Sequence, residues 1–270
     1  MKVILRKMIR YGLIALALLV ILSLIPFGGY AAANTLPNPS AITLSQDLLT
    51  VQKEGQSPET IVQALAILDA RELKAELDTR EKQLSFWVNI YNGMVQYLLE
   101  KEPAFWERRN NFFSTRRFTI AGQFLSLEDV EHGIIRGGEA KLGLGHIPKL
   151  FQNKFERTFK IKKGDPRVHF ALNCGAIDCP PVEIYDPATV NERFDHRSRV
   201  YLKKHTTIAE DGKSLTTTPL FSWFRGDFGT YGGISDFLVH FGILTEENKN
   251  IKRKYKNYDW TLATNVWAED

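Results

Sequence analysis

The segment His169–Pro181, HFALNCGAIDCPP, decides how the fold is interpreted, because it holds both cysteines of this 270-residue chain. Its apolar residues end abruptly at Cys174-Gly175, a pattern typical of a buried strand that reaches a surface loop. We therefore predict a strand over residues 168–174, followed by a loop that carries the two thiols. Such loops often present reactive groups on a rigid support. The thiols could serve as a nucleophile, a redox pair, a metal site or a disulfide.

The pattern of the first 33 residues predicts that the protein is exported. Four basic residues precede an apolar core over residues 13–27 and a small-residue exit over 28–34, which are the parts of a signal peptide. The core of about 15 residues is shorter than the roughly 20 needed to span a bilayer. An uncleaved membrane anchor is the alternative, and only then would the membrane be a partner. We expect a periplasmic, extracellular or outward-facing anchored protein.

The charge of the remaining chain excludes a nucleic-acid footprint. The whole chain has 35 Lys and Arg against 31 Asp and Glu. Residues 1–33 contribute four bases and no acids, so the rest carries 31 of each and is neutral. A nucleic-acid-binding domain carries a clustered excess of positive charge. We expect no nucleic-acid partner.

Hydrophobic periodicity and turn residues predict mostly helices with a few short strands. Helices are expected over 61–77 with a break at 69–71, and over 81–101, 126–135, 149–159, 189–205 and 234–241. A hairpin is expected over 117–126 and a strand over 214–219. Because helices and strands are segregated, the predicted class is α+β, a single domain with helices packed on a small, mainly antiparallel sheet. The expected divisions are a signal peptide or anchor (1–33), an extended leader (34–60), the domain (61–245) and a C-terminal extension (246–270).

Asn89 and Asn92 lie three residues apart on one face of the helix expected over 81–101. Asparagine is mildly unfavourable inside a helix. The pair therefore indicates buried hydrogen bonding.

Four ordered blocks resemble one known family. They are SFWVNIYN (85–92), SLEDVEHGIIR (126–136), DPRVHFALNC (165–174) with CPP (179–181), and LFSWFRGDF (220–228). Together they resemble the DUF547 family over about residues 60–243. The resemblance implies a domain of unknown function, loosely associated with papain-like thiol hydrolase folds of rearranged order.

A thiolate nucleophile needs a base or a positive field close by. On a strand, His169 and Cys174 would face opposite sides and lie about 16 Å apart, so His169 would not serve Cys174. His132 is the better candidate base, because Glu128 four residues earlier could orient it on a helix.

Glu131 would then point elsewhere, toward Arg136 or Arg167. The structural alternative is a buried polar lattice of Glu131, His132 and Arg167. The catalytic candidates are Cys174, His132 and Glu131. The supporting candidates are Asn89, Asn92, Glu128, Arg136, Arg167, His169, Asn173 and Cys179.

The main competing interpretation is a Cys174–Cys179 disulfide, since two cysteines in one loop of an exported protein usually oxidise. The spacing is not Cys-x-x-Cys, which disfavours a redox function. His169, His132 or Asp178 could complete a zinc site, but no second closely spaced Cys or His pair exists. We expect no metal and no other cofactor.

Two functions remain. One is a thiol-dependent hydrolase or acyltransferase that acts on an envelope amide or peptide-like substrate. The other is a non-catalytic envelope or binding protein with a disulfide and a structural His/Glu/Arg network. The aromatic residues of 223–228 could line a cleft, although core packing with a turn at Gly226 is the favoured interpretation.

Overall fold

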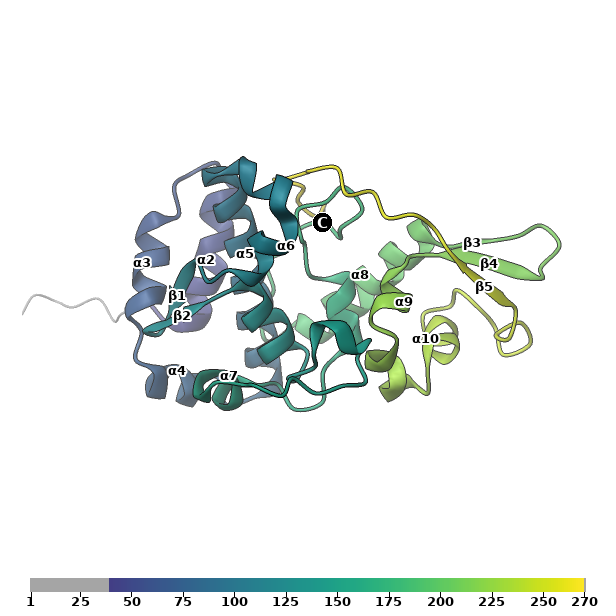
Figure 1. The fold of residues 1–270 in the computed structure, drawn as a ribbon, viewed down its shortest axis with the longest axis horizontal. Coiled ribbons are helices and arrows are strands. Elements are labelled where there is room, and N and C mark those ends of the chain that lie inside the picture. Colours follow the sequence, from purple (N-terminus) through teal and green to yellow (C-terminus); the bar gives the residue numbers. More distant parts are fainter. Residues whose placement is uncertain (1–38, 270) are drawn as a thin grey trace, which may run out of the picture. The chain divides into compact units, whose positions relative to one another are not determined.

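A computed structural model describes residues 39–269, so the predicted signal or anchor segment lies outside the described residues. The fold is built around one long helix, α5 (Arg80–Lys101), whose residues 84–96 are all buried. Helix α2 (Ala41–Lys53) packs along α5, with α3 (Glu59–Ile67) beside it (Figure 1). A helix buried on every side reads as a core element rather than as an amphipathic surface helix.

The remaining elements are mostly short. The α-helices are α4 (Ala70–Glu76), α6 (Arg109–Ser114), α7 (Lys154–Phe159), α8 (Val190–His205), α9 (Leu220–Trp223) and α10 (Ile234–His240). The 3₁₀ helices are η1 (Pro103–Arg108), η3 (Lys141–Gly143), η4 (Pro166–Phe170) and η5 (Arg225–Tyr231), and η2 (Asp129–Ile135) is a π-helix. The strands are β1 (Phe118–Ile120), β2 (Gln123–Leu125), β3 (Thr207–Ile208), β4 (Ser214–Thr217) and β5 (Lys252–Tyr255).

The strands form two small sheets, which confirms the α+β class. Strands β1 and β2 make the expected antiparallel hairpin, with Ala121-Gly122 as its turn. In the second sheet β3 pairs antiparallel with β4, and β4 pairs parallel with β5. Strand β5 comes from residues that we expected to form an extension, so the 246–270 segment is an integral part of the fold (Figure 1).

The leader expected over residues 34–60 is wrong for most of its length, because it contains α2. The side chain of Ser40 caps this helix by accepting a hydrogen bond from the Thr43 amide. The Glu76 carboxylate accepts from the amides of Ala41 and Ile42, at 3.0 and 2.9 Å, and so satisfies further N–H groups of the first turn. The two prolines before Ser40 suggested an extended chain, but they only precede the helix start.

The strand expected over residues 168–174 is also wrong, because η4 occupies Pro166–Phe170. Asp165 accepts a hydrogen bond from the Arg167 amide at 3.1 Å, and Pro166 stands at the first helical position, where its fixed φ is favourable. The alternation of side chains on a strand therefore does not apply to His169 and Cys174.

The other long predicted elements are confirmed, with shifted ends. The break near residue 69 separates α3 from α4, and Asp69 caps α4 by accepting from the amides of Arg71 and Glu72. The helix expected over 149–159 begins only at Lys154, because Asn153 and Glu156 form a capping box there.

Buried apolar residues form two clusters. The larger surrounds α5 and includes Trp87, and the smaller is an aromatic cluster with Phe170, Phe221 and Phe237 at its centre. Among residues 39–269, no helix is long and apolar enough to cross a membrane.

The two asparagines of α5 have the predicted buried role. Asn89 donates to the carbonyl of Tyr185 at 2.8 Å and accepts from its amide at 2.9 Å. Asn92 donates to the Ala171 carbonyl at 3.0 Å and accepts from the Asn173 amide at 2.8 Å. Each side chain thus replaces a backbone partner for an irregular segment that crosses α5.

We predict that Asn92→Ala lowers the free energy of unfolding by about 2–4 kcal/mol, because a buried amide and a buried carbonyl lose their partner. The matched control is Asn250→Ala, at an exposed position with no side-chain hydrogen bond, which should change stability by less than about 0.5 kcal/mol. Urea denaturation of both variants is the measurement, and equal effects would contradict the assigned role.

Candidate functional site

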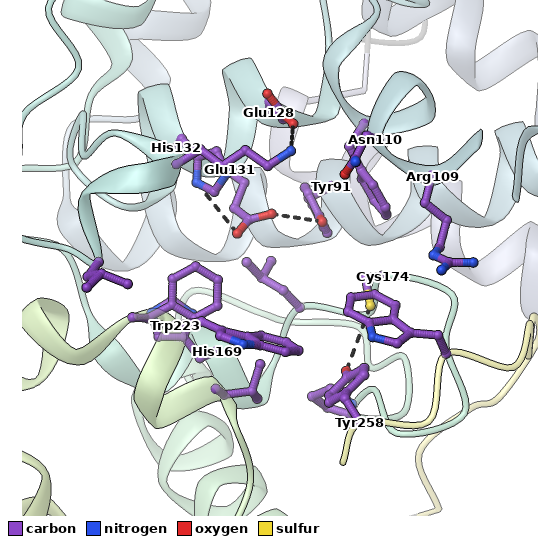
Figure 2. A pocket seen from close by; sticks show the side chains of 18 residues that line it. Tyr91, Arg109, Asn110, Glu128, Glu131, His132, His169, Cys174, Trp223 and Tyr258 are labelled. Carbon is purple, nitrogen blue, oxygen red and sulfur yellow. Dashed lines mark hydrogen bonds and ion pairs between the residues drawn. The ribbon is translucent and has the colours of Figure 1, made fainter. Parts of the chain in front are cut away.

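A cavity of about 510 Å³ lies where the two apolar clusters meet. One side, the polar wall, carries Tyr91, Glu131 and His132, and Trp223 and Tyr258 lie opposite it (Figure 2). Together with Phe224 and Trp260, which also line the cavity, Trp223 and Tyr258 form the aromatic wall. A mostly apolar cavity with a few convergent polar groups is the usual form of a small-molecule site. The remaining lining residues are Arg109, Asn110, Phe113, Glu128, Lys141, Leu144, His169, Leu172, Cys174, Pro180 and Leu220.

The π-helix η2 supplies Glu131 and His132 of the polar wall, and α5 supplies Tyr91. The start of η2 is fixed by Ser126 and Asp129, since each side chain accepts a hydrogen bond from the amide of the other residue, at 3.0 and 3.1 Å. A π-turn is rare and often occurs at functional sites. Here it places Glu131 and His132 side by side at the cavity, with a carboxylate oxygen of Glu131 3.7 Å from Nδ1 of His132.

Arg136 is at the centre of the hydrogen-bond network behind this wall. Its side chain is fully buried and donates from Nε and Nη2 to the two carboxylate oxygens of Asp227, at 2.7 and 2.9 Å. A further nitrogen, Nη1, lies 2.9 Å from Nδ1 of His132. The guanidinium also lies over the ring of Phe224, with its central carbon 4.6 Å from the ring centre. One buried cation therefore holds η2 against the segment 224–227.

This contact fixes the protonation state of His132. A guanidinium only donates hydrogen bonds, so Nδ1 of His132 accepts and the ring proton resides on Nε2. Burial lowers the pKa of His132 below 6.5, and although Glu131 raises it, Arg136 lowers it further. His132 is therefore a neutral donor at neutral pH, with no free nitrogen lone pair to take a proton from a thiol.

His169 differs from His132, because its hydrogen-bonded ring nitrogen donates instead of accepting. Its Nε2 lies 2.8 Å from a carboxylate oxygen of Asp227, which can only accept, so Nε2 carries a proton and Nδ1 is the remaining ring nitrogen. The ring stacks on Phe224 with centres 4.1 Å apart. An aspartate that orients a histidine in this way is a common feature of acid–base sites. His169 thus lines the cavity with its ring held by Asp227, and it forms no hydrogen bond with Cys174.

Glu131 keeps its negative charge in this environment. The Tyr91 hydroxyl donates to one of its oxygens at 3.0 Å. Burial raises the pKa of Glu131, but the fields of His132, Arg136 and His169 outweigh burial and hold the pKa below its ordinary 4.5. Within residues 39–269, no lysine or arginine forms an ion pair with this carboxylate, because Asp227 occupies Arg136.

Two expected contacts are replaced by others. Glu128 forms an ion pair with Lys141 and does not orient His132, because η2 does not follow α-helical spacing. Arg167 lies outside the polar wall and binds Asp165 and Asp195, at 2.7 and 2.8 Å. The predicted lattice therefore exists with Arg136 in the place of Arg167.

The two cysteines form a disulfide, so one of the predicted alternatives is confirmed. The Cys174 sulfur lines the cavity, 3.9 Å from the Tyr258 hydroxyl (Figure 2). The same hydroxyl donates to the Cys179 sulfur at 3.3 Å. Among residues 39–269, no histidine nitrogen lies within hydrogen-bond distance of either sulfur. In this oxidised state neither cysteine is a thiolate.

Asn173 fixes the loop that carries the disulfide. Its side-chain oxygen accepts from the Gly175 amide at 2.9 Å and from Gln96 at 3.1 Å, while its side-chain nitrogen donates to the Pro180 carbonyl at 2.7 Å. Gly175 has a φ of 91°, and a Cβ there would lie 2.6 Å from Leu99. Glycine is the residue that meets both conditions at low cost.

The C-terminal segment completes the aromatic wall. Backbone hydrogen bonds join Ile177 to Thr261 at 2.9 Å and Ala263 to Gly175 at 2.8 Å, so this segment is bound to the disulfide loop. It contributes Tyr258 and Trp260, whose rings pack with centres 4.7 Å apart.

The structure thus brings Glu131, His132, His169 and Cys174 to one cavity. Arg136, Asn92 and Asn173 lie behind it as supports. Sequence reasoning missed Tyr91, Arg109, Tyr258 and Trp260 as lining residues; of these, Tyr91 lay inside a quoted block, whereas the other three gave no local signal. Trp223 and Phe224 line the cavity, so the cleft interpretation holds for these two residues, whereas Phe228 is core.

No group of three or more metal-ligating side chains occurs in the part of the chain that the structure describes. The nearest arrangement is the polar wall, where Arg136 and Asp227 already occupy one nitrogen of each histidine.

Comparison with known proteins gives one match. Residues 75–202 match the family model described as "Protein of unknown function, DUF547". The chain carries a DUF547 domain. The matched range is narrower than the four blocks that resemble the family, and it includes η2 and the disulfide loop but not Asp227 or the C-terminal aromatic residues of the cavity. No curated protein and no solved structure matches this DUF547 chain significantly.

We predict that Asp227→Asn lowers the free energy of unfolding by about 3–5 kcal/mol at pH 7, because the buried Arg136 loses the carboxylate with which it pairs among residues 39–269. Asp236→Asn is the matched control, since it removes one partner of the partly exposed Lys249 and should cost at most about 1 kcal/mol.

The pH dependence has a definite sign. Although burial disfavours its charge, hydrogen bonds from His169 and Arg136 hold the pKa of Asp227 well below 3.8. Its stabilisation is thus complete above the ordinary value and is lost as pH falls through the folded value. Denaturation curves from pH 7 to 2 should show this loss in the wild type and not in Asp227→Asn, and identical profiles would contradict the assignment.

Proposed function

We propose that this DUF547 protein is an exported binding protein whose cavity holds a short peptide-like zwitterion. The observation that carries the proposal is a pair of unmatched charges at the cavity, Glu131 and Arg109, separated by aromatic side chains. We assign the ligand ammonium to Glu131, its apolar side chains to the aromatic wall and its carboxylate to Arg109.

The case for an ammonium group rests on charge balance. Two ion pairs lie around the polar wall, Asp227 with Arg136 and Glu128 with Lys141. Glu131 forms no ion pair with a lysine or arginine among residues 39–269, and its 15% exposed side chain lines the cavity. A charge held in this environment without a counter-ion is favourable for binding a cation, since partial desolvation strengthens the attraction.

The case for a carboxylate rests on Arg109. Its guanidinium lies 5.4 Å from the ring centres of both Trp106 and Trp260. No carboxylate pairs with it among residues 39–269, so its hydrogen-bond donors are available at the cavity. A planar guanidinium on an aromatic face is well suited to bidentate carboxylate binding.

The aromatic wall supports an apolar body between the two charges. Trp223 stacks on Trp260 with ring centres 5.7 Å apart, and Tyr258 packs against both. Such rings provide large contact areas at low cost in side-chain entropy. The disulfide stabilises this arrangement, because it bonds Cys174 at the cavity to Cys179, and the Cys179 sulfur accepts a hydrogen bond from Tyr258. Disulfides persist in the oxidising compartments to which we assign the protein.

The test uses phenylalanyl-phenylalanine as the probe, with its N-acetyl and C-amide derivatives, each of which lacks one charge. We predict that each derivative binds the full chain roughly tenfold more weakly than the parent, equivalent to about 1.4 kcal/mol per charge. Isothermal titration or quenching of the cavity tryptophans gives the affinities.

The variants assign each charge to its partner. Glu131→Gln should remove the penalty of N-acetylation and leave that of C-amidation, while Arg109→Gln should do the reverse. Glu128→Gln is the matched control, because this carboxylate also lines the cavity but is paired with Lys141. Equal binding of all three ligands to the wild type, or the same response in Glu128→Gln as in Glu131→Gln, would contradict the proposal.

The thiol-dependent hydrolase is the second candidate, and one observation favours it: the Cys174 sulfur lines the same cavity as two histidines. Reduction of the disulfide would free a thiol there. The Asp227-oriented His169 supports this candidate better than His132, because the remaining ring nitrogen of His169, Nδ1, can accept a proton, whereas the remaining nitrogen of His132, Nε2, already carries one.

The second candidate predicts a reactive thiol in Cys179→Ala, where Cys174 is free. Its alkylation by iodoacetamide at pH 7 should be at least about tenfold faster than that of glutathione, because a base lowers the thiol pKa from about 8.5. His169→Gln should abolish the excess rate. Alkylation at the rate of an ordinary thiol would reject the hydrolase and leave the binding function.

A further inference from the structure

Beyond the cavity, the most unusual surface is a loop with four outward-facing apolar side chains. In the apolar loop, residues 144–151, the exposed fractions are 42% for Leu144, 54% for Ile147, 82% for Leu150 and 89% for Phe151. Single exposed apolar residues need no explanation, but a contiguous group marks an interaction site.

The apolar loop is held in this conformation by its backbone. The Ala140 amide donates to the Ile147 carbonyl and the Lys149 amide donates to the Gly138 carbonyl, both at 2.7 Å. The Gly226 amide donates to the Leu144 carbonyl at 2.7 Å, and Lys149 forms ion pairs with Asp129 and Glu156. These contacts hold the backbone up to Lys149, and Leu150 and Phe151, which follow it, are exposed.

The surroundings of the loop are strongly basic. Residues 139–163 contain seven lysines and arginines against two glutamates. The side chains of Lys154, Arg157, Lys162 and Lys163 are exposed and have no ion-pair partner among residues 39–269. The rest of the chain beyond residue 33 is therefore net acidic, so the excess of positive charge lies in the segment of the sequence that contains the apolar loop.

We propose that the apolar loop docks this protein on an anionic lipid bilayer. Large apolar side chains at the tip, flanked by bases, match the interface, where the apolar groups enter the acyl boundary and the bases meet anionic headgroups. The charge of the 139–163 region favours a lipid surface with negative headgroups over a neutral apolar partner.

Docking there would set the cavity next to the bilayer. Lys141 and Leu144 line the cavity, and Ile147, Leu150 and Phe151 follow within the same loop. This proposal does not depend on the nature of the cavity ligand, and it stands or fails separately from the binding function.

The test uses the full chain with a photo-crosslinking residue, Phe151→p-benzoylphenylalanine, mixed with vesicles of three parts phosphatidylcholine and one part phosphatidylglycerol. Ile67→p-benzoylphenylalanine is the matched control, since Ile67 is 85% exposed at the end of α3 and belongs to no basic region. This control also corrects for lipid contact brought about by residues 1–33. Phe151 makes no core contact, and unfolding curves of both variants verify that they fold as the wild type.

We expect several-fold more lipid adduct at position 151 than at position 67, with a loss of that excess in 1 M salt, where the Debye length falls to about 3 Å. The excess should also fall when phosphatidylglycerol is omitted. Mass spectrometry identifies the partner, so adducts to a second chain or to residues 11–33 would overturn the proposal in favour of those occupants. Equal lipid adducts at both positions would overturn it as well.

Discussion

The cavity depends on one buried cation, the guanidinium of Arg136. It has no exposed surface, and it connects η2 on one side with Asp227 on the other. A charge in that position is stable only if it is fully paired, which demands that His132 accept and that Asp227 remain ionised. These two requirements determine that Nε2 carries a proton in each histidine, and they leave Glu131 without a lysine or arginine partner among residues 39–269. The chemistry that the cavity offers therefore follows from a single buried charge.

Sequence reasoning recovered the elements that local forces determine. The extent of α5, expected over residues 81–101, the turn of the β1–β2 hairpin and the buried hydrogen bonding of Asn89 and Asn92 were all predicted correctly. In each case the residues that specify the structure lie within a few positions of one another. The four-block resemblance to the DUF547 family agrees with the match over residues 75–202.

The errors share a different cause, since they concern partners far apart in the chain. Helix α2 was missed because its cap includes Glu76, about 35 residues away, and the segment before it is rich in proline. The strand expected at residues 168–174 was wrong because a buried apolar run of that length does not distinguish a strand from a helical turn. Asp227 and Tyr258 were not predicted as partners of His169 and the disulfide, because no sequence periodicity links residues 58 to 84 positions apart.

The central claim is that Arg136 determines the chemistry of the cavity, because it holds His132 neutral with its proton on Nε2. Nitrogen-15 NMR of the imidazole rings tests it most directly, because the shifts of Nδ1 and Nε2 distinguish the two neutral tautomers from the charged ring. The account predicts the Nε2–H tautomer for His132 at pH 7, with no protonation until the pH is below the ordinary value of 6.5. A protonated His132 at pH 7, or a proton on Nδ1, would contradict it.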